Sequence, residues 1–129
     1  MIYLDSSVVL ARVFAEARSP ADAFWWQRFT SSKRLEYEVM NRVNQRAYVA
    51  QRAGNARVLI DNVELIELSP IVLARALSPF PTPVKTLDGL HLATMDYLRA
   101  NGQTFRLASY DKRLIAAAEA IGVVVETGL

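Results

Sequence analysis

Four acidic residues stand where their side chains can gather around a cation. Asp5 directly follows a short apolar run that we interpret as a buried strand, and Asp111 follows a second strand-like segment. Glu38 and Asp88 lie near the predicted starts of two helices. In an open α/β sheet, the carboxyl ends of the strands and the starts of the following helices share one edge. We therefore expect the four carboxylates to converge there.

Carboxylates brought this close repel one another. At an effective dielectric constant of about 20, each pair ~4 Å apart costs roughly 4 kcal/mol, so the cluster must stay partly protonated or hold a cation. The chain has no cysteine, and carboxylate and hydroxyl oxygens favour a hard ion, Mg²⁺ or Mn²⁺. Such an ion activates water and neutralises charge on a phosphoryl oxygen. The pattern therefore predicts a metal-dependent phosphodiesterase.

Taken singly, these residues also have purely structural interpretations. Asp88 suits the cap or first turn of a helix, and Glu38 suits an ion pair with Arg34 or Arg42, one turn away on either side. His91 is the only histidine. We interpret it as a packing or hydrogen-bonding residue and not as a general base, because hydrolysis by carboxylates and metal does not need one.

Basic residues are concentrated in one part of the chain. The formal net charge is only +2, but residues 28–57 contain seven basic residues and two acids. A block of this kind favours phosphate backbones, and we predict that Arg34, Arg42 and Arg46 contact a polynucleotide. A solvated helix face that keeps the protein soluble explains the same charges equally well.

Strands and helices alternate along the chain, which indicates an α/β fold with a mainly parallel central sheet covered by helices on both faces. The predicted strands are 2–4, 63–68, 105–110 and 123–126. The predicted helices are 6–17, 20–29, 33–52, 56–62, 70–77, 87–100 and 112–121. The long helix has an apolar stripe formed by Leu35, Val39, Val43 and Ala47. No composition shift marks a boundary, so we expect residues 1–129 to form one domain.

Length and composition restrict the class of protein further. A chain of 129 residues with 52% hydrophobic residues can fill a core without disulfides or structural metal sites. The same composition can also supply an apolar oligomer interface. It shows neither a secretory signal nor an apolar run near the ~18 residues of a membrane span, so we expect a soluble, cytoplasmic protein. Within the predicted helix 20–29, we expect Trp25 and Phe29 in the core and Trp26 half exposed, as a candidate partner site.

Four motifs together resemble the PIN-domain ribonucleases and, more narrowly, the VapC toxins of bacterial toxin–antitoxin pairs. They are Tyr-Leu-Asp-Ser-Ser at 3–7, Ser-Lys-Arg-Leu-Glu-Tyr-Glu at 32–38, Thr-Leu-Asp-Gly-Leu-His-Leu-Ala-Thr at 86–94 and Ser-Tyr-Asp-Lys-Arg-Leu at 109–114. The likeness covers essentially the whole chain. It implies a compact three-layer α/β/α sandwich and Mg²⁺- or Mn²⁺-dependent cleavage of RNA.

The resemblance also implies roles for individual residues. The acidic, catalytic pocket would consist of Asp5, Glu38, Asp88 and Asp111. Asp5 and Asp88 would be the closest metal ligands, with Asp111 as a third; Asp111 and Glu38 would alternatively hold a second metal or orient the attacking water. Hydroxyl support would come from Ser7 and from Ser109, where this family more often has threonine.

The resemblance further implies partners: an RNA substrate, a cognate antitoxin protein of a type II toxin–antitoxin system, and a second copy of the chain in a homodimer. Two other functions compete with the ribonuclease. A phosphatase of the haloacid dehalogenase type also places an aspartate after its first strand, but it usually needs another two residues on, where this chain has Ser7. A catalytically inactive PIN module would bind only RNA or protein, and the intact set of acids argues against it.

Overall fold

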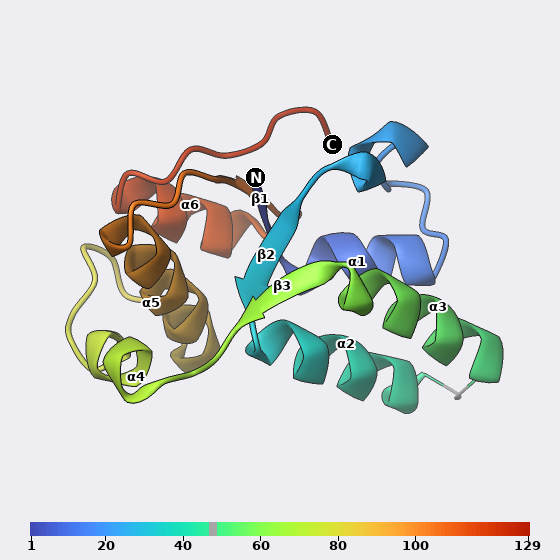
Figure 1. The fold of residues 1–129 in the computed structure, drawn as a ribbon, viewed down its shortest axis with the longest axis horizontal. Coiled ribbons are helices and arrows are strands. Elements are labelled where there is room, and N and C mark those ends of the chain that lie inside the picture. The colour runs from blue at the N-terminus through green and yellow to red at the C-terminus, as the bar shows by residue number, and fades with distance from the viewer. Residues whose placement is uncertain (47–48) are drawn as a thin grey trace.

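Residues 1–46 and 49–129 are described by the structure, which is a computed structural model. Within these ranges the chain forms a four-stranded sheet, six α-helices and one short 3-10 helix, η1 (Figure 1). The strands are β1 (Ile2–Leu4), β2 (Phe29–Ser32), β3 (Val63–Ile66) and β4 (Arg106–Ala108). The helices are α1 (Ser6–Val13), η1 (Asp22–Trp26), α2 (Arg34–Gln45), α3 (Ala50–Asp61), α4 (Pro70–Ala76), α5 (Thr86–Ala100) and α6 (Lys112–Ala120).

The elements build three layers, which confirms the predicted α/β/α sandwich. Helices α1, α2 and α3 cover one face of the sheet, and α5 and α6 cover the other, with α4 packed against α5 (Figure 1). Each face has its own hydrophobic cluster. Residues of β1 alternate between them, Ile2 and Leu4 facing α1–α3 and Tyr3 facing α5 and α6. None of the described helices is long and apolar enough to cross a membrane.

All strand pairs are parallel, and the order β3-β2-β1-β4 places a topological switch point at β1. From β1 the chain adds β2 and β3 on one side, and β4 then lies on the other. Open parallel sheets bind ligands in the crevice outside the carboxyl ends of the strands at such a point. Asp5 follows β1 and Ser109 follows β4, so both lie there.

The predicted helix 20–29 is wrong. Only the short η1 forms there, and Phe29 begins β2. This strand carries hydroxyl side chains that read as a turn in the sequence, but the carbonyl of Glu64 accepts a hydrogen bond from Thr30 at 3.0 Å, and that of Leu4 accepts one from Ser31 at 2.7 Å. Because the hydroxyls of Thr30 and Ser31 have these hydrogen-bond partners, both residues can be buried in the sheet.

The aromatic residues of this segment also differ from expectation. Trp25 and Phe29 do pack together, with ring centroids 5.6 Å apart, although they do not share a helix. Trp26 is 84% exposed and not half exposed.

Several predicted boundaries also move. The first helix ends at Val13, because Ala15 has a φ of 49°, a left-handed conformation that cannot continue a helix. The predicted helix 33–52 is not one helix, because α2 ends at Gln45 and α3 begins at Ala50 and runs through Gly54, where the sequence predicts a break. In the long-helix stripe Leu35, Val39 and Val43 are buried, and Ala47 lies outside the described residues. The predicted strand 123–126 is reduced to a single parallel bridge between Leu107 and Val125.

Candidate active site

Asp5 is a buried carboxylate at the switch point. It follows β1 and caps α1, because its Oδ2 accepts from the backbone N–H of Ser7 at 3.4 Å. The same oxygen accepts from the hydroxyls of Ser7 at 2.6 Å and Ser109 at 2.8 Å. Ser7 also contacts the segment that follows β4, because its Oγ accepts from the N–H of Tyr110 at 2.9 Å. Among the described residues, Asp5 Oδ1 accepts no hydrogen bond and lies 4.0 Å from His91 Nε2.

Glu38 lies one turn into α2, where a buried hydrogen-bonded chain fixes its carboxylate. Burial raises the pKa of Tyr3, so its hydroxyl stays protonated. That hydroxyl accepts from the N–H of Ser32 at 3.2 Å and donates to Nδ1 of His91 at 2.7 Å. Nε2 of His91 donates to Glu38 Oε1 at 2.9 Å, because a carboxylate oxygen accepts. His91 is fully buried and acts as a hydrogen-bonding residue.

Arg34 places a positive charge inside the pocket. Its side chain is only 10% exposed, and its Nη2 lies 2.9 Å from Glu38 Oε2. Nη1 donates to the carbonyl of Leu87 and lies 3.8 Å from Asp88 Oδ1. Within the described residues Nε is buried and has no hydrogen-bond partner. The guanidinium thus stands between the carboxylate from α2 and the carboxylate from α5.

Asp88 is the third residue of α5 and does not cap that helix, whose N-cap is Lys85. Its side chain is 17% exposed. Burial raises the pKa of Asp88, and the negative charge of Asp111 raises it further; Arg34 opposes them without cancelling them. The structure therefore brings Asp88, Asp111 and Asp5 within electrostatic range, with Asp5 also raising this pKa.

Asp111 follows β4 and is the N-cap of α6. Its Oδ1 accepts from the backbone N–H groups of Arg113 at 2.9 Å and Leu114 at 3.3 Å. Ser109 joins it to the rest of the site, because Ser109 Oγ accepts from the N–H of Asp111 at 2.9 Å while donating to Asp5. The side chain of Asp111 is exposed, so it forms the outer rim of the pocket.

The four acids and both serines thus meet at one edge of the sheet, but not as a finished metal site. Among the described residues, no group of three or more acidic or histidine side chains is positioned to hold a metal ion as it stands. The donor set still suits a hard cation, because Asp5, Asp88 and Asp111 offer only carboxylate oxygens, and they are close enough for the charges of Asp111 and Asp5 to add to burial in raising the pKa of Asp88. Arg34 is the cation that the structure places among these carboxylates.

The basic residues predicted to contact RNA are dispersed. Arg34 is enclosed by the acids, Arg42 is exposed in the last turn of α2 and Arg46 follows that helix. Arg46 is about 18 Å along the helix axis from Arg34, with its guanidinium 4.7 Å from the ring of Phe14. Part of the block is paired with acid, because Glu36 binds both Lys33 at 3.1 Å and Arg57 at 2.6 Å.

A pocket of about 370 Å³ adjoins Asp88 on the side of α5 and α6. Asp88 lines it together with Lys85 and Arg113, and both basic side chains are exposed. In the described part of the chain neither cation forms an ion pair. A phosphate group beside the acidic pocket would therefore meet positive charge here.

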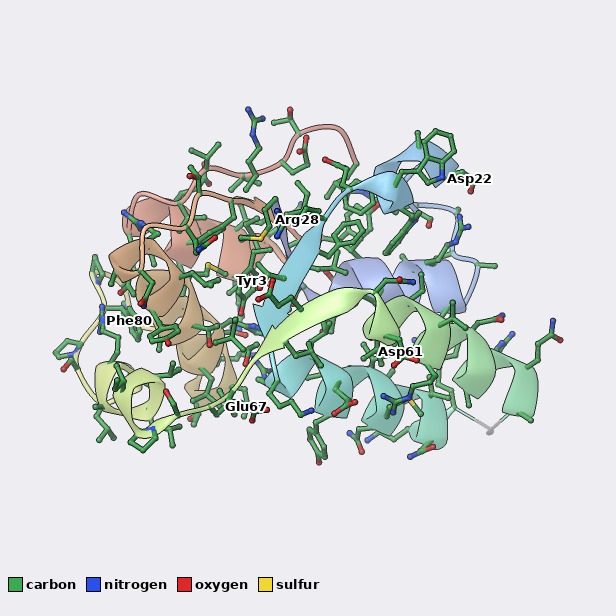
Figure 2. The ribbon with its side chains drawn as sticks, in the orientation of Figure 1. Tyr3, Asp22, Arg28, Asp61, Glu67 and Phe80 are labelled. Atoms are coloured by element: carbon green, nitrogen blue, oxygen red, sulfur yellow. The ribbon has the colours of Figure 1, made fainter. Side chains whose placement is uncertain are left out.

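Sequence reasoning did not find the buried partners of the site. Tyr3 looks like an ordinary core residue of β1, and its contact with His91 spans 88 positions of the chain. The available signal was chemical: a tyrosine and a histidine in otherwise apolar segments each need a hydrogen-bond partner when buried. Figure 2 shows Tyr3 in the middle of the molecule, between the helical layers.

Comparison with known proteins agrees with this geometry. The family model described as "PIN domain" matches residues 2–120. The chain is 32% identical over 127 residues to Ribonuclease VapC46 of Mycobacterium tuberculosis strain H37Rv, covering 96% of this chain and 95% of the relative. Ribonuclease VapC35 of the same species is 28% identical, covering 97% and 95%, and VapC47 is 24% identical, covering 96% and 94%. The chain belongs to the PIN-domain family.

Proposed function

We propose that this protein is an endoribonuclease toxin of a type II toxin–antitoxin system that hydrolyses RNA phosphodiester bonds with Mg²⁺ or Mn²⁺. The observation that carries the proposal is the convergence of Asp5, Asp88 and Asp111 at the switch point, where burial first, and then the negative charges of Asp111 and Asp5, raise the pKa of Asp88. Relatives named ribonuclease, matching almost the whole chain, support the same substrate class.

Each residue of the pocket has a definable task in such a reaction. Asp5 offers Oδ1 to the ion, since hydroxyl donors already engage its Oδ2, and Asp88 and Asp111 complete an all-oxygen set. The bound ion would supply water of lowered pKa and charge neutralisation at the phosphoryl oxygen. Glu38 orients the attacking water through Oε1, which accepts one bond from His91 and has room for another.

Charge and shape favour RNA entering beside α5 and α6. A carboxylate pocket repels bare phosphate, so the nucleotides flanking the cleaved bond need nearby cations. Lys85 and Arg113 line the pocket next to Asp88 and are not paired with acids among the described residues. Arg42 and Arg46 lie further along α2 and remain candidates for a more distant stretch of the same RNA.

The experiment is RNA cleavage by the purified protein with Mg²⁺, with Mn²⁺ and with EDTA. We expect cleavage only with metal, and Asp5→Asn should abolish both cleavage and growth arrest on expression. Asp61→Asn is the matched control, because Asp61 is exposed and ends α3 just before β3, at the opposite edge of the sheet (Figure 2). Full cleavage in EDTA would refute metal dependence, whereas rapid hydrolysis of a chromogenic phosphomonoester would favour the phosphatase.

The partners follow from the same proposal. A cognate antitoxin would block the acidic pocket, and a homodimer would cover apolar surface. Exposed apolar side chains on and after α4, Ile71, Leu73 and Leu77, support an interface there. Leu73 and Leu77 line an open groove of about 810 Å³ together with the proline-rich loop 79–83. Light scattering coupled to gel filtration tests the dimer, and monomeric mass at micromolar concentration would argue against it.

A further inference from the structure

We propose that Arg34 is an internal counter-cation of the acidic pocket, so that the protein binds one divalent ion, on its aspartate side, and not two. The inference rests on the proposed function, because it concerns the ion of that same site. Arg34 occupies the place between Glu38 and Asp88 that a second metal ion would take. Arg34 is thereby a positioning residue and not a contact for the RNA backbone.

Glu38 is already engaged by donors of the protein. Both of its oxygens already accept hydrogen bonds from the protein: Oε1 from His91 at 2.9 Å, and Oε2 from Ser6 at 3.2 Å and Arg34 at 2.9 Å. An ion shared by Glu38 and Asp88 would have to displace the Arg34 guanidinium, which already lies between them. Breaking a buried charge-assisted bond without replacing it costs more than a typical neutral hydrogen bond.

Unlike Glu38, each of the three aspartates keeps a carboxylate oxygen that accepts no hydrogen bond from the described residues. In the described chain Asp5 Oδ1 accepts no hydrogen bond, and Asp88 has only its 3.8 Å approach to Arg34. Asp111 uses Oδ1 to cap α6 and keeps Oδ2 for a ligand. Among the described residues, the oxygens that accept no hydrogen bond are therefore those of the aspartates and not those of Glu38. One ion can be held by the aspartates with Arg34 in place.

Arg34 is fixed in the pocket. Its side chain is nine-tenths buried, and it binds three groups on two helices: Glu38 on α2, and the carbonyl of Leu87 and the carboxylate of Asp88 on α5. Its Nε is buried without a partner among the described residues, so this N–H can meet an acceptor that enters the pocket, such as a water of a bound ion. The guanidinium accordingly belongs to the site and does not swing freely on its surface.

The test is a titration of the full-length, metal-free protein with Mn²⁺, in which electron paramagnetic resonance counts the free ion. We expect one tight ion per wild-type chain and two in Arg34→Gln, where Glu38 and Asp88 regain oxygens for a second ion. Arg34→Lys, which keeps the charge, and Arg42→Gln, which removes a positive charge two turns along α2, should each bind one. Circular dichroism checks that every variant is folded.

Two ions on the wild-type chain, or one ion on folded Arg34→Gln, would overturn the inference. If Arg34→Gln does not fold, the wild-type and Arg34→Lys stoichiometries still decide it, because two ions on either contradicts an internal cation. RNA cleavage by the same samples separates the two proposals. One bound ion without cleavage leaves the role of Arg34 standing and removes the ribonuclease, whereas cleavage with two bound ions removes only the role of Arg34.

Discussion

Asp88 is a residue of this pocket whose ionised form destabilises the folded protein. Burial and the neighbouring Asp111 raise its pKa, and the attraction of Arg34 is the smaller, opposing effect. When folding raises the pKa of an acid, the folded protein binds more protons than the unfolded chain at pH values between the ordinary pKa and the raised pKa. Ionised Asp88 therefore costs stability at neutral pH, and that cost disappears as the pH falls through the raised pKa.

We accordingly expect Asp88→Asn to raise the melting temperature of the metal-free protein by a few degrees at pH 7 while abolishing RNA cleavage. The gain over wild type should shrink as the pH falls through the raised pKa towards the ordinary value of 3.8, because wild-type Asp88 is then also neutral. Thermal unfolding of both proteins in EDTA across this pH range measures the difference in melting temperature. A variant less stable than wild type at neutral pH would show that Arg34 dominates the environment of Asp88.

At this scale the sequence predicts residue types better than it predicts their partners. The four acids could be selected because each follows a strand or starts a helix. The ion pair of Glu38 with Arg34 was equally visible as an i, i+4 pair on one helix, and the structure contains it at 2.9 Å. Its second contact was not visible, because Arg34 reaches Asp88 from another helix, 54 positions away in the chain.

At the scale of elements, the same unit occurs twice: a buried strand, an aspartate and a helix. Asp5 links β1 to α1 and Asp111 links β4 to α6, and each aspartate is the N-cap of its helix. One carboxylate oxygen satisfies backbone N–H groups of the first turn, and the other remains available to the pocket. Capping and metal binding are therefore not competing explanations of these two acids, because the two oxygens do different work.

Substitutions of Asp111 can separate the two tasks. Asn caps a helix about as well as Asp, so we expect Asp111→Asn to keep the free energy of unfolding within about 0.5 kcal/mol, whereas Asp111→Ala should lose about 1 kcal/mol. Both should slow RNA cleavage by roughly tenfold or more, because each removes a charged oxygen from the site. Urea unfolding and initial cleavage rates provide the two readouts. Equal destabilisation by both variants would mean that the cap is not formed.

The strands and helices around these units could be predicted unevenly, for physical reasons. β1, β3 and the helices α4 to α6 were found because they have apolar periodicity and clear end signals, such as Ser69 before Pro70. β2 was missed, because its hydroxyl side chains look like a turn unless their acceptors on β1 and β3 are known. Pairing between distant strands decides such a segment, and local propensity does not.

At the scale of the whole molecule, charge is divided between two surfaces that RNA could use. One surface lies beside α5 and α6, where Lys85 and Arg113 border the pocket that contains Asp88. The other follows the exposed end of α2, where Arg42 and Arg46 lie. Acids next to the reacting phosphate make nearby cations more valuable than distant ones, because charges further apart than about 8–10 Å are screened at physiological salt.

We therefore expect the paired substitution Lys85→Gln with Arg113→Gln to raise KM for a single-stranded RNA by roughly tenfold at low salt, with a smaller change in kcat. Each lost phosphate contact should also flatten the dependence of log KM on log salt by about 0.7, so the pair should reduce the slope by up to about 1.4. Arg42→Gln with Arg46→Gln is the matched control, since it removes the same net charge from the other surface. If the control pair raises KM more than the first pair does, the RNA follows α2 and the pocket beside Asp88 is not its binding surface.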